Sequence, residues 1–240
     1  MKLRLYVVPG SHPCAAVEKA LQLKGLNYRV WEWPPPLHAP MQLLMTGRRT
    51  VPSLRLDGEH VSGSKAIMRR LDQLVPEPPL FPSDQELRAR VEAAEAWGDE
   101  TFQPIARELI WAGAVRRPEA LLSYGADARL RLPDAAVRLS APLIARAERL
   151  LNRTDDQTAR RRLAELPAHL DRIDAWLADG TLNGPEAPNA ADLQILSTVR
   201  LIGTFADARA FLAGRPCEQA ARELWPQWAG ELPAGAIAAA

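Results

Sequence analysis

The sequence predicts an α/β domain followed by an all-helical domain. Over the first 33 residues, two strand-like runs of alternating side chains flank a run with apolar side chains at helical spacing. Four prolines between positions 76 and 82 indicate an extended linker. After them, apolar side chains recur at spacings of three and four, typical of helices that pack in a bundle. We therefore expect an α/β domain at residues 1–76, a linker at residues 77–84 and a helical domain at residues 85–240.

The N-terminal elements follow from the positions of proline and glycine. The strand of residues 3–8 stops at a Pro-Gly pair, a helix then runs to about Lys24, and residues 28–33 form a second strand. Ser11 lies in the turn that opens the helix, where the helix dipole favours negative charge. The serine can equally be a plain helix cap.

A third strand and a second helix start are predicted within residues 50–67. Pro52 has no N–H to donate, so it fits the first residue of a strand or an exposed edge, where Val51 keeps free backbone groups for an extended ligand. Ser64 places a hydroxyl beside unpaired N–H groups at a helix N-terminus, which suits a carboxylate. The same segment is also compatible with an ordinary strand, turn and helix that bind nothing.

The helical region begins with a predicted capping box, with Ser83 as the N-cap and Glu86 reaching back. The helix is expected to continue to about Ile110 with a kink at Pro104. A later helix carries a core-facing stripe of apolar side chains between positions 163 and 177. The Ala-rich C-terminal tail is expected to fray.

Composition limits the classes of function. The 30 basic and 29 acidic side chains leave a net charge of +1, so there is no overall field for nucleic acid or anionic membrane. Cys14 and Cys217 are too few for a disulfide framework, and we expect both to be reduced. The histidines lack metal-ligand spacing. Without a cleavable signal or a long apolar run, the chain is predicted to be soluble and cytoplasmic.

Together these motifs resemble the glutathione S-transferase family in its serine-type form. Ser11 with Val17 six residues later is similar to the family's serine-type signature. The Val51-Pro52 pair resembles the loop that holds the family's cis-proline, and residues 64–67 resemble the helix that receives the γ-glutamyl carboxylate. Residues 188–193 resemble the start of a late helix with a capping box. The resemblance covers most of the chain but is weak in the middle of the helical region.

This resemblance implies a thioredoxin-like N-terminal domain in the order βαβ-α-ββα, a helical-bundle C-terminal domain and a homodimer. It also implies glutathione as the co-substrate, with no metal. The reaction would be attack of the glutathione thiolate on a small hydrophobic electrophile held between the domains.

The resemblance further implies the roles of individual residues. Ser11 orients the sulfur, Val51 and Pro52 pair with the cysteinyl backbone, and Ser64 receives the γ-glutamyl carboxylate. Arg49 can meet the glycyl carboxylate, the alternative being a solvated loop arginine. A thiol ionises near pH ~8.5, and lowering its pKa by about two units requires roughly 2.7 kcal/mol. A hydroxyl hydrogen bond worth about 1.5–3 kcal/mol and a helix terminus worth about 0.3–1 kcal/mol supply that amount.

Two departures from the family pattern affect these expectations. Gly63 stands where the family commonly has an acidic residue or Gln, which predicts weak glutathione binding and tighter binding in Gly63→Glu if the backbone does not require a positive φ. Cys14 falls at the second cysteine of a Cys-x-x-Cys motif whose first cysteine is replaced by Ser11. It is either a reactive low-pKa thiol that contributes to catalysis or a small buried hydrophobe.

Two alternative functions stay open on the sequence alone. One is a catalytically silent transferase-like module used for protein association. The other is a glutathione-dependent isomerase or thiol reductase that acts through the same cleft.

Overall fold

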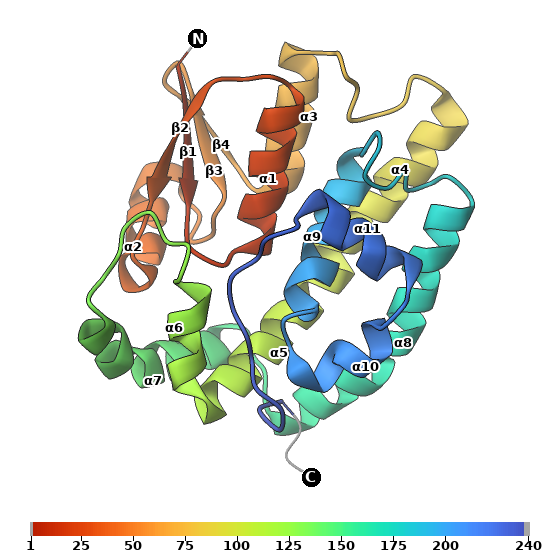
Figure 1. Ribbon diagram of the computed structural model, residues 1–240. Helices are drawn as coiled ribbons and strands as arrows, with labels where there is room; N and C mark the ends of the chain where they lie inside the picture. Colours follow the sequence, from red (N-terminus) through yellow and green to blue (C-terminus); the bar gives the residue numbers. More distant parts are fainter. Residues whose placement is uncertain (1, 238–240) are drawn as a thin grey trace.

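The computed structural model describes residues 2–237, which form an α/β unit followed by a largely helical unit (Figure 1). This arrangement confirms the predicted fold class, including the order βαβ-α-ββα. The N-terminal elements are β1 (Leu3–Val7), α1 (His12–Leu23), β2 (Tyr28–Glu32), α2 (Pro35–Thr46), β3 (Ser53–Leu56), β4 (Glu59–Ser62) and α3 (Ser64–Leu74). The helical elements are α4 (Gln85–Trp97), α5 (Gln103–Arg116), α6 (Leu121–Tyr124), α7 (Asp134–Leu151), α8 (Asp156–Ala178), α9 (Ala190–Ile202), α10 (Arg209–Leu212) and α11 (Pro216–Leu224). A π-helical turn, η1 (Gly98–Phe102), and two 3-10 turns, η2 (Pro118–Ala120) and η3 (Ala206–Ala208), lie between them.

The sheet has the strand order β2-β1-β3-β4, with β1 parallel to β2 and antiparallel to β3. Alternation along β1 decides the face that each side chain takes. Leu3, Leu5 and Val7 are buried in the core that the sheet shares with α1 and α3. Tyr6 points to the other face, where its ring stacks on that of Trp33 with 6.2 Å between centroids.

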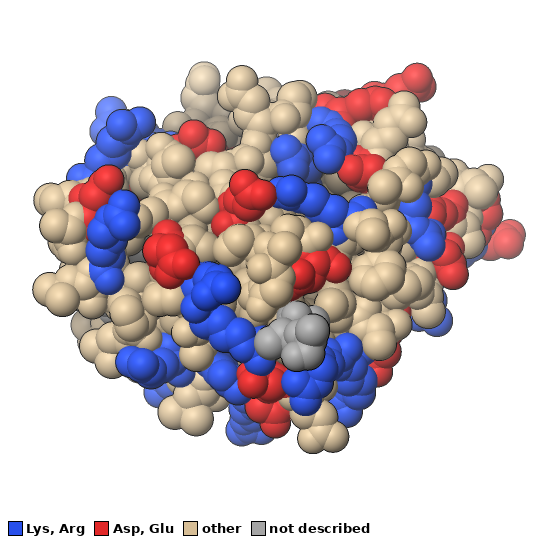
Figure 2. Space-filling model, turned by 60° about the horizontal axis from the view of Figure 1, so that its bottom comes forward, with Lys and Arg blue, Asp and Glu red and all other residues tan. Residues whose placement is uncertain are grey.

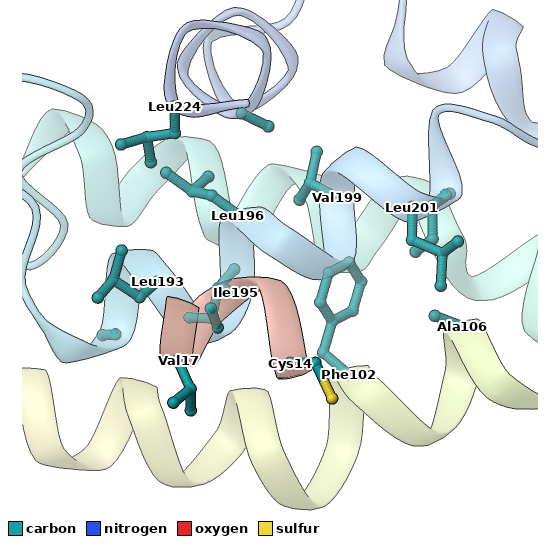
Figure 3. Close-up of a cluster of buried hydrophobic side chains, with 14 of the residues drawn as sticks. Cys14, Val17, Phe102, Ala106, Leu193, Ile195, Leu196, Val199, Leu201 and Leu224 are labelled. Carbon is teal, nitrogen blue, oxygen red and sulfur yellow. The ribbon is translucent and has the colours of Figure 1, made fainter. Parts of the chain in front are cut away.

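Helix α9 forms the centre of the helical unit. Every residue of this helix except Arg200 is buried, as expected for a helix that is packed on all sides. Helices α1, α4, α5 and α11 pack against it. Figure 3 shows the resulting cluster, to which α1 contributes Cys14 and Val17 and the π-helical turn contributes Phe102. The two units therefore share one continuous core.

The two predicted capping boxes have different outcomes. The box at α9 is confirmed, because the Asn189 side chain accepts hydrogen bonds from backbone N–H groups and the Asp192 carboxylate accepts one from the Asn189 N–H at 3.0 Å. The box predicted at Ser83 is wrong. Asp84 is the N-cap of α4, and its carboxylate accepts a hydrogen bond from the Leu87 N–H at 2.8 Å.

The predicted long helix is interrupted by the π-helical turn. Helix α4 is followed directly by η1 and then by α5. The helical segment therefore ends at Arg116, beyond the predicted end at about Ile110. Pro104 lies in the first turn of α5, where a missing N–H is tolerated. Gly98 allows η1 to approach α9 closely, because a Cβ at this position would lie 2.8 Å from Cγ1 of Ile195. Such π-turns are often found at functional sites.

The proline-rich segment after α3 is anchored to the α/β unit. The Lys24 ammonium group is fully buried and donates hydrogen bonds to the Asp72 carboxylate at 2.7 Å and to the carbonyls of Pro76 and Pro78. The predicted boundaries of the two domains, with a linker at residues 77–84, stay a prediction.

The C-terminal segment is held in place as far as Ile237. The Arg116 guanidinium donates hydrogen bonds to the carbonyls of Ala236 and Ile237 at 3.0 and 2.8 Å. The Asp207 carboxylate accepts a hydrogen bond from the Ile237 N–H at 2.8 Å. The expected fraying of the tail is therefore wrong up to this residue, and the last three residues lie outside the described range.

The surface mixes both signs of charge. On the face shown in Figure 2, basic and acidic side chains are interspersed among neutral ones. Within residues 2–237, no helix is long and apolar enough to cross a bilayer. The same residues contain no group of three or more His, Cys, Asp or Glu side chains placed to hold a metal ion. Cys14 and Cys217 are both free thiols.

Candidate active site

The strand register brings three predicted site segments to one end of the sheet. Tyr6 pairs with Ser53, and Ser53 pairs with Ser62 on the next strand. Continuing this register by one residue places Pro52 opposite Gly63, and the Gly63 N–H donates a hydrogen bond to the Pro52 carbonyl at 2.9 Å. Helices α1 and α3 both begin at this end of the sheet. The positive ends of two helix dipoles therefore face the same region, which favours an anionic ligand.

Ser11 is the N-cap residue of α1, with an extended backbone at φ −79° and ψ 112°. Its hydroxyl forms no capping bond with the helix backbone, so the first N–H groups of α1 are left without a side-chain acceptor. The hydroxyl instead forms a hydrogen bond with the Cys14 side chain one turn later. A ligand atom at this helix start would meet both the hydroxyl and the free N–H groups.

Cys14 is buried, with 2% of its surface exposed. Burial raises the pKa of its thiol to about 12, although hydrogen bonds from Ser11 and from the Val8 backbone act in the opposite direction. The thiol is therefore protonated at neutral pH. This environment is that of a small buried hydrophobe and not that of a reactive thiolate.

The loop before β3 contains a cis peptide bond between Val51 and Pro52. Pro52 is buried and Val51 is half-buried. Among the described residues, no hydrogen bond is formed by the Val51 backbone N–H or C=O. These groups lie in the loop directly before the first residue of β3. The strand itself is paired with β1 and β4 and is not an edge strand, so an extended ligand could pair only with this loop.

Gly63 and Ser64 form the start of α3. Gly63 is the N-cap with φ 94° and ψ 139°, a conformation that glycine adopts easily and other residues resist. No side chain caps the helix, and Ser64 is 4% exposed. The Lys65 ammonium group, 3.6 Å from the Glu100 carboxylate, adds positive charge next to this helix start.

Arg49 lies apart from these groups. It is exposed in the loop between α2 and β3, and no ion pair within residues 2–237 involves its guanidinium. The two alternatives for Arg49, a contact with the glycyl carboxylate of glutathione or a solvated position in the loop, both stay predictions.

A cleft of about 730 Å³ opens beside Ser11. Its walls come from four parts of the chain: the end of β1 with the following turn and α1, the end of β2, the end of α6 with the loop after it, and the end of α11 with the segment after it. Ser11 and Cys14 line this cleft, whereas the predicted residues of the cis-proline loop and of α3 do not. Sequence analysis missed most of its lining, including Glu18, Lys19, Gln22, Glu32, Tyr124, Asp127, Arg129, Trp225 and Trp228.

The cleft combines aromatic and charged walls. Trp225 and Trp228 pack edge to face, and the Lys19 ammonium lies 5.9 Å from the centre of the Trp225 ring. Arg129 forms an ion pair with Glu18 at 2.8 Å and lies 3.8 Å from the Glu32 carboxylate. These contacts hold the loop after α6 against the α/β unit. No local spacing in the sequence indicates them, because the partners are about 100 residues apart.

Comparisons with known proteins agree with this geometry. Residues 5–79 match the family model described as the N-terminal domain of glutathione S-transferase. Comparison with curated proteins gives no match.

Solved structures extend the likeness to the whole chain. A glutathione S-transferase from Rhodospirillum rubrum F11 is 22% identical with a TM-score of 0.62, over 98% of each chain. Glutathione transferase F2 from Populus trichocarpa is 14% identical with a TM-score of 0.63, over 92% of this chain and 91% of that one. A maleylacetoacetate isomerase from Anaeromyxobacter dehalogenans 2CP-1, with glutathione bound in its active site, is 23% identical with a TM-score of 0.51, over 93% and 88%.

The α/β unit with a helical unit behind it is therefore a thioredoxin-like domain followed by a helical C-terminal region. This combination is the glutathione S-transferase fold, and the resemblance predicted from the sequence is confirmed.

Proposed function

We propose that this protein is a glutathione S-transferase that joins the glutathione thiolate to a small hydrophobic electrophile. The observation that supports the proposal most is the convergence, at one end of the sheet, of the Ser11 turn, the cis Val51-Pro52 loop and the start of α3 at Ser64. An anionic, peptide-sized thiol needs a thiolate site, free backbone groups to pair with and a carboxylate site, and these three segments offer one each.

In this proposal Ser11 acts on the sulfur. Its hydroxyl is not used as a backbone cap, so it can donate a hydrogen bond to the bound thiolate while the α1 dipole adds to the stabilisation. The backbone of Val51 and Pro52 pairs with the cysteinyl residue of glutathione, and Ser64 with the α3 N-terminus receives the γ-glutamyl carboxylate. Arg49 meets the glycyl carboxylate.

The acceptor is proposed to bind in the cleft beside Ser11, against Tyr124, Trp225 and Trp228. The thiolate attacks an electrophilic carbon, a C–S bond forms, and the electron pair of the broken bond leaves with the departing group or with the opened ring oxygen. Aromatic walls suit an apolar acceptor.

Gly63 favours a second candidate, a catalytically silent module, because it offers no side chain to hold the ligand's γ-glutamyl end. The isomerase alternative uses the same cleft and is distinguished only by substrate. The thiol-reductase alternative is disfavoured by Cys14, because attack on a disulfide needs a thiolate and this thiol is buried with a pKa of about 12.

Retention on immobilised glutathione, followed by a screen of aryl halides, epoxides and disulfides, tests the proposal. Retention with turnover of an aryl halide or epoxide supports it. Retention without turnover of any electrophile supports the silent module. Because weak binding is expected, only the absence of binding in a calorimetric titration with glutathione contradicts glutathione as the thiol. We also propose that the protein acts as a cytoplasmic homodimer, which light scattering on the purified chain tests for the oligomeric state.

A further inference from the structure

Exposed apolar side chains gather in two segments of the chain. In the described range, every large hydrophobic side chain that is exposed lies within residues 31–44 or residues 130–151. Single exposed leucines are ordinary on a protein surface, but their confinement to two segments indicates a surface that something covers. The set is one tryptophan and nine leucines: Trp31, Leu37, Leu43, Leu44, Leu130, Leu132, Leu139, Leu143, Leu150 and Leu151.

The two segments lie on one side of the molecule. The Glu32 carboxylate at the end of β2 accepts a hydrogen bond from the Leu130 N–H at 2.9 Å and lies 3.8 Å from the Arg129 guanidinium. Further along, the His38 imidazole of α2 is close enough to the Glu148 carboxylate of α7 to act on it electrostatically. Figure 1 shows α2 and α7 together at the left of the molecule.

Helix α7 turns its large apolar side chains away from the protein. It packs against α5, and its two buried residues are alanines, Ala141 and Ala145. Leu139, Leu143 and Leu150 are spaced four and seven residues apart, so they share the opposite face, and they are 85%, 72% and 78% exposed. An ordinary surface helix has the reverse arrangement, with its apolar stripe toward the core. The sequence of α7 therefore places leucines where only a partner outside the chain can cover them.

The same surface is strongly basic. Residues 29–49 and 129–153, whose exposed side chains we call the α2–α7 surface, contain nine arginines and three acidic residues. Their net charge is +6, whereas that of the whole chain is +1, so the balanced total hides a local positive field. Arg129 and Arg149 pair with Glu18 and Asp156. The other seven arginines form no ion pair within the described chain: Arg29, Arg48, Arg49, Arg131, Arg138, Arg146 and Arg153.

The charge of the α2–α7 surface argues against a second copy of the chain as its partner. In a two-fold symmetric pair the same surface meets itself, so unpaired arginines would face one another. Like charges brought together at an interface oppose binding, and three acidic residues cannot neutralise nine arginines. The partner that fits is apolar and anionic at once.

We propose that the α2–α7 surface docks on an anionic lipid bilayer. Helix α7 would lie in the plane of the interface, with Leu139, Leu143 and Leu150 among the acyl chains and the arginines at the phosphate head groups. Trp31, which is 48% exposed, has the side chain typical of the boundary between head groups and acyl chains. A bilayer accepts these side chains without a matching groove, which an acidic protein would have to supply. The inference goes beyond the proposed transferase function and does not rest on it.

Flotation of the protein with vesicles tests the docking. We expect binding to vesicles of equal parts phosphatidylcholine and phosphatidylglycerol, much weaker binding to pure phosphatidylcholine, and loss of binding as salt is raised. Leu139→Gln combined with Leu143→Gln should weaken binding to the anionic vesicles at least about tenfold, because two apolar side chains no longer enter the acyl region. Both side chains are exposed, so circular dichroism should show an unchanged fold.

Arg138→Gln and Arg160→Gln form a matched pair of charge variants. Both residues are exposed arginines of long helices, α7 and α8, without an ion pair in the described chain. Near an anionic lipid surface each arginine contributes about a fivefold gain in binding. Arg138→Gln should therefore lose about that factor, while Arg160→Gln should bind like the parent. Equal losses in the two variants would contradict the assignment of this surface.

Absence of binding to the anionic vesicles at low salt would overturn the proposal, as would full binding by the leucine double variant. Light scattering without lipid adds a separate outcome. A dimer that the leucine double variant converts to a monomer would show that a second copy covers the surface, which also overturns the proposal. Because these measurements use neither glutathione nor an electrophile, failure of the transferase proposal leaves them unaffected.

Discussion

The Gly63 N–H donates a hydrogen bond to the Pro52 carbonyl at 2.9 Å and so ties the start of α3 to the cis-proline loop. Gly63 makes this bond with φ 94° and ψ 139°, outside the left-handed helical region that Asn visits. Sequence analysis expected tighter glutathione binding in Gly63→Glu only if the backbone did not require a positive φ, and at Gly63 it does. We no longer expect that substitution to tighten glutathione binding, and weak binding by the unmodified chain stays a prediction.

Gly63→Asn is expected to lower the free energy of unfolding by about 1–3 kcal/mol, the usual cost of an unfavourable backbone region. A Cβ at this position would meet no atom within 4 Å, so the loss would come from backbone strain and not from a clash. Gly47→Asn is the matched control, because Gly47 also has open space but adopts φ 71° and ψ 4°, which Asn tolerates. Chemical denaturation measures the free energy of unfolding of both variants relative to the parent. Equal losses in the two variants would contradict the assignment of backbone strain to Gly63.

Ser11→Ala is expected to raise the pKa of bound glutathione by about 1–2 pH units, because a hydroxyl bond to the thiolate worth about 1.5–3 kcal/mol is lost. The fold should persist, since the hydroxyl caps no backbone group of α1. Thiolate absorbance of the complex against pH measures the effect. Cys14→Ala is the control and should leave this pKa and the conjugation rate close to those of the parent, given its protonated thiol. An unchanged pKa in Ser11→Ala would remove Ser11 from the proposed mechanism.

Lys24→Met is expected to lower the free energy of unfolding by about 3–5 kcal/mol, the usual cost of removing one partner of a buried ion pair. The fully buried ammonium group bonds to Asp72 at 2.7 Å and to two carbonyls of the proline-rich segment, each of which would lose this donor, although Asp72 keeps its hydrogen bond from the Leu80 N–H. Lys19→Met, on the same helix but without an ion pair in the described chain, should change stability much less. Thermal unfolding monitored by circular dichroism gives the comparison, and similar melting temperatures for the two variants would argue against this anchor.

Sequence analysis predicted the elements with local signals. The apolar face of α1, the proline before β3 and the Asn189 capping box all depend on residues within one turn of each other. It failed where two local solutions were equivalent, as at α4, where Ser83 and Asp84 are both good caps. It could not find the contact of Arg129 with Glu18, because nothing near either residue indicates the other.

The candidate site likewise has residues that local sequence signals predict and residues that they do not. Ser11 and the Val51-Pro52 loop were predicted from the prolines and glycines that bound the strands and helices, and from the resemblance to the family. The positive φ of Gly63 was raised only as a condition, since glycine permits both signs of φ.

Glu95 should make the stability of the fold depend on pH. This carboxylate of α4 is fully buried and forms an ion pair with Arg69 of α3, so it joins the two units. Burial raises its pKa to about 7, with Arg69 and Lys65 acting in the opposite direction. The folded state therefore holds the Glu95 proton more tightly than the unfolded state, whose pKa is near 4.3. The stabilisation from this proton is complete below about pH 4 and is lost as the pH rises through 7.

Glu95→Gln removes this titration, because the amide carries no charge at any of these pH values. Relative to the variant, the parent should lose about 2–4 kcal/mol of unfolding free energy between pH 4.5 and pH 8. Urea denaturation at several pH values measures the difference between the two proteins, which cancels the titration of all other groups. Glu92→Gln, which removes a partly exposed glutamate of the same helix, should show a pH profile parallel to that of the parent. A Glu95→Gln profile that is also parallel would mean that Glu95 is ionised in the folded protein throughout this range, held so by Arg69.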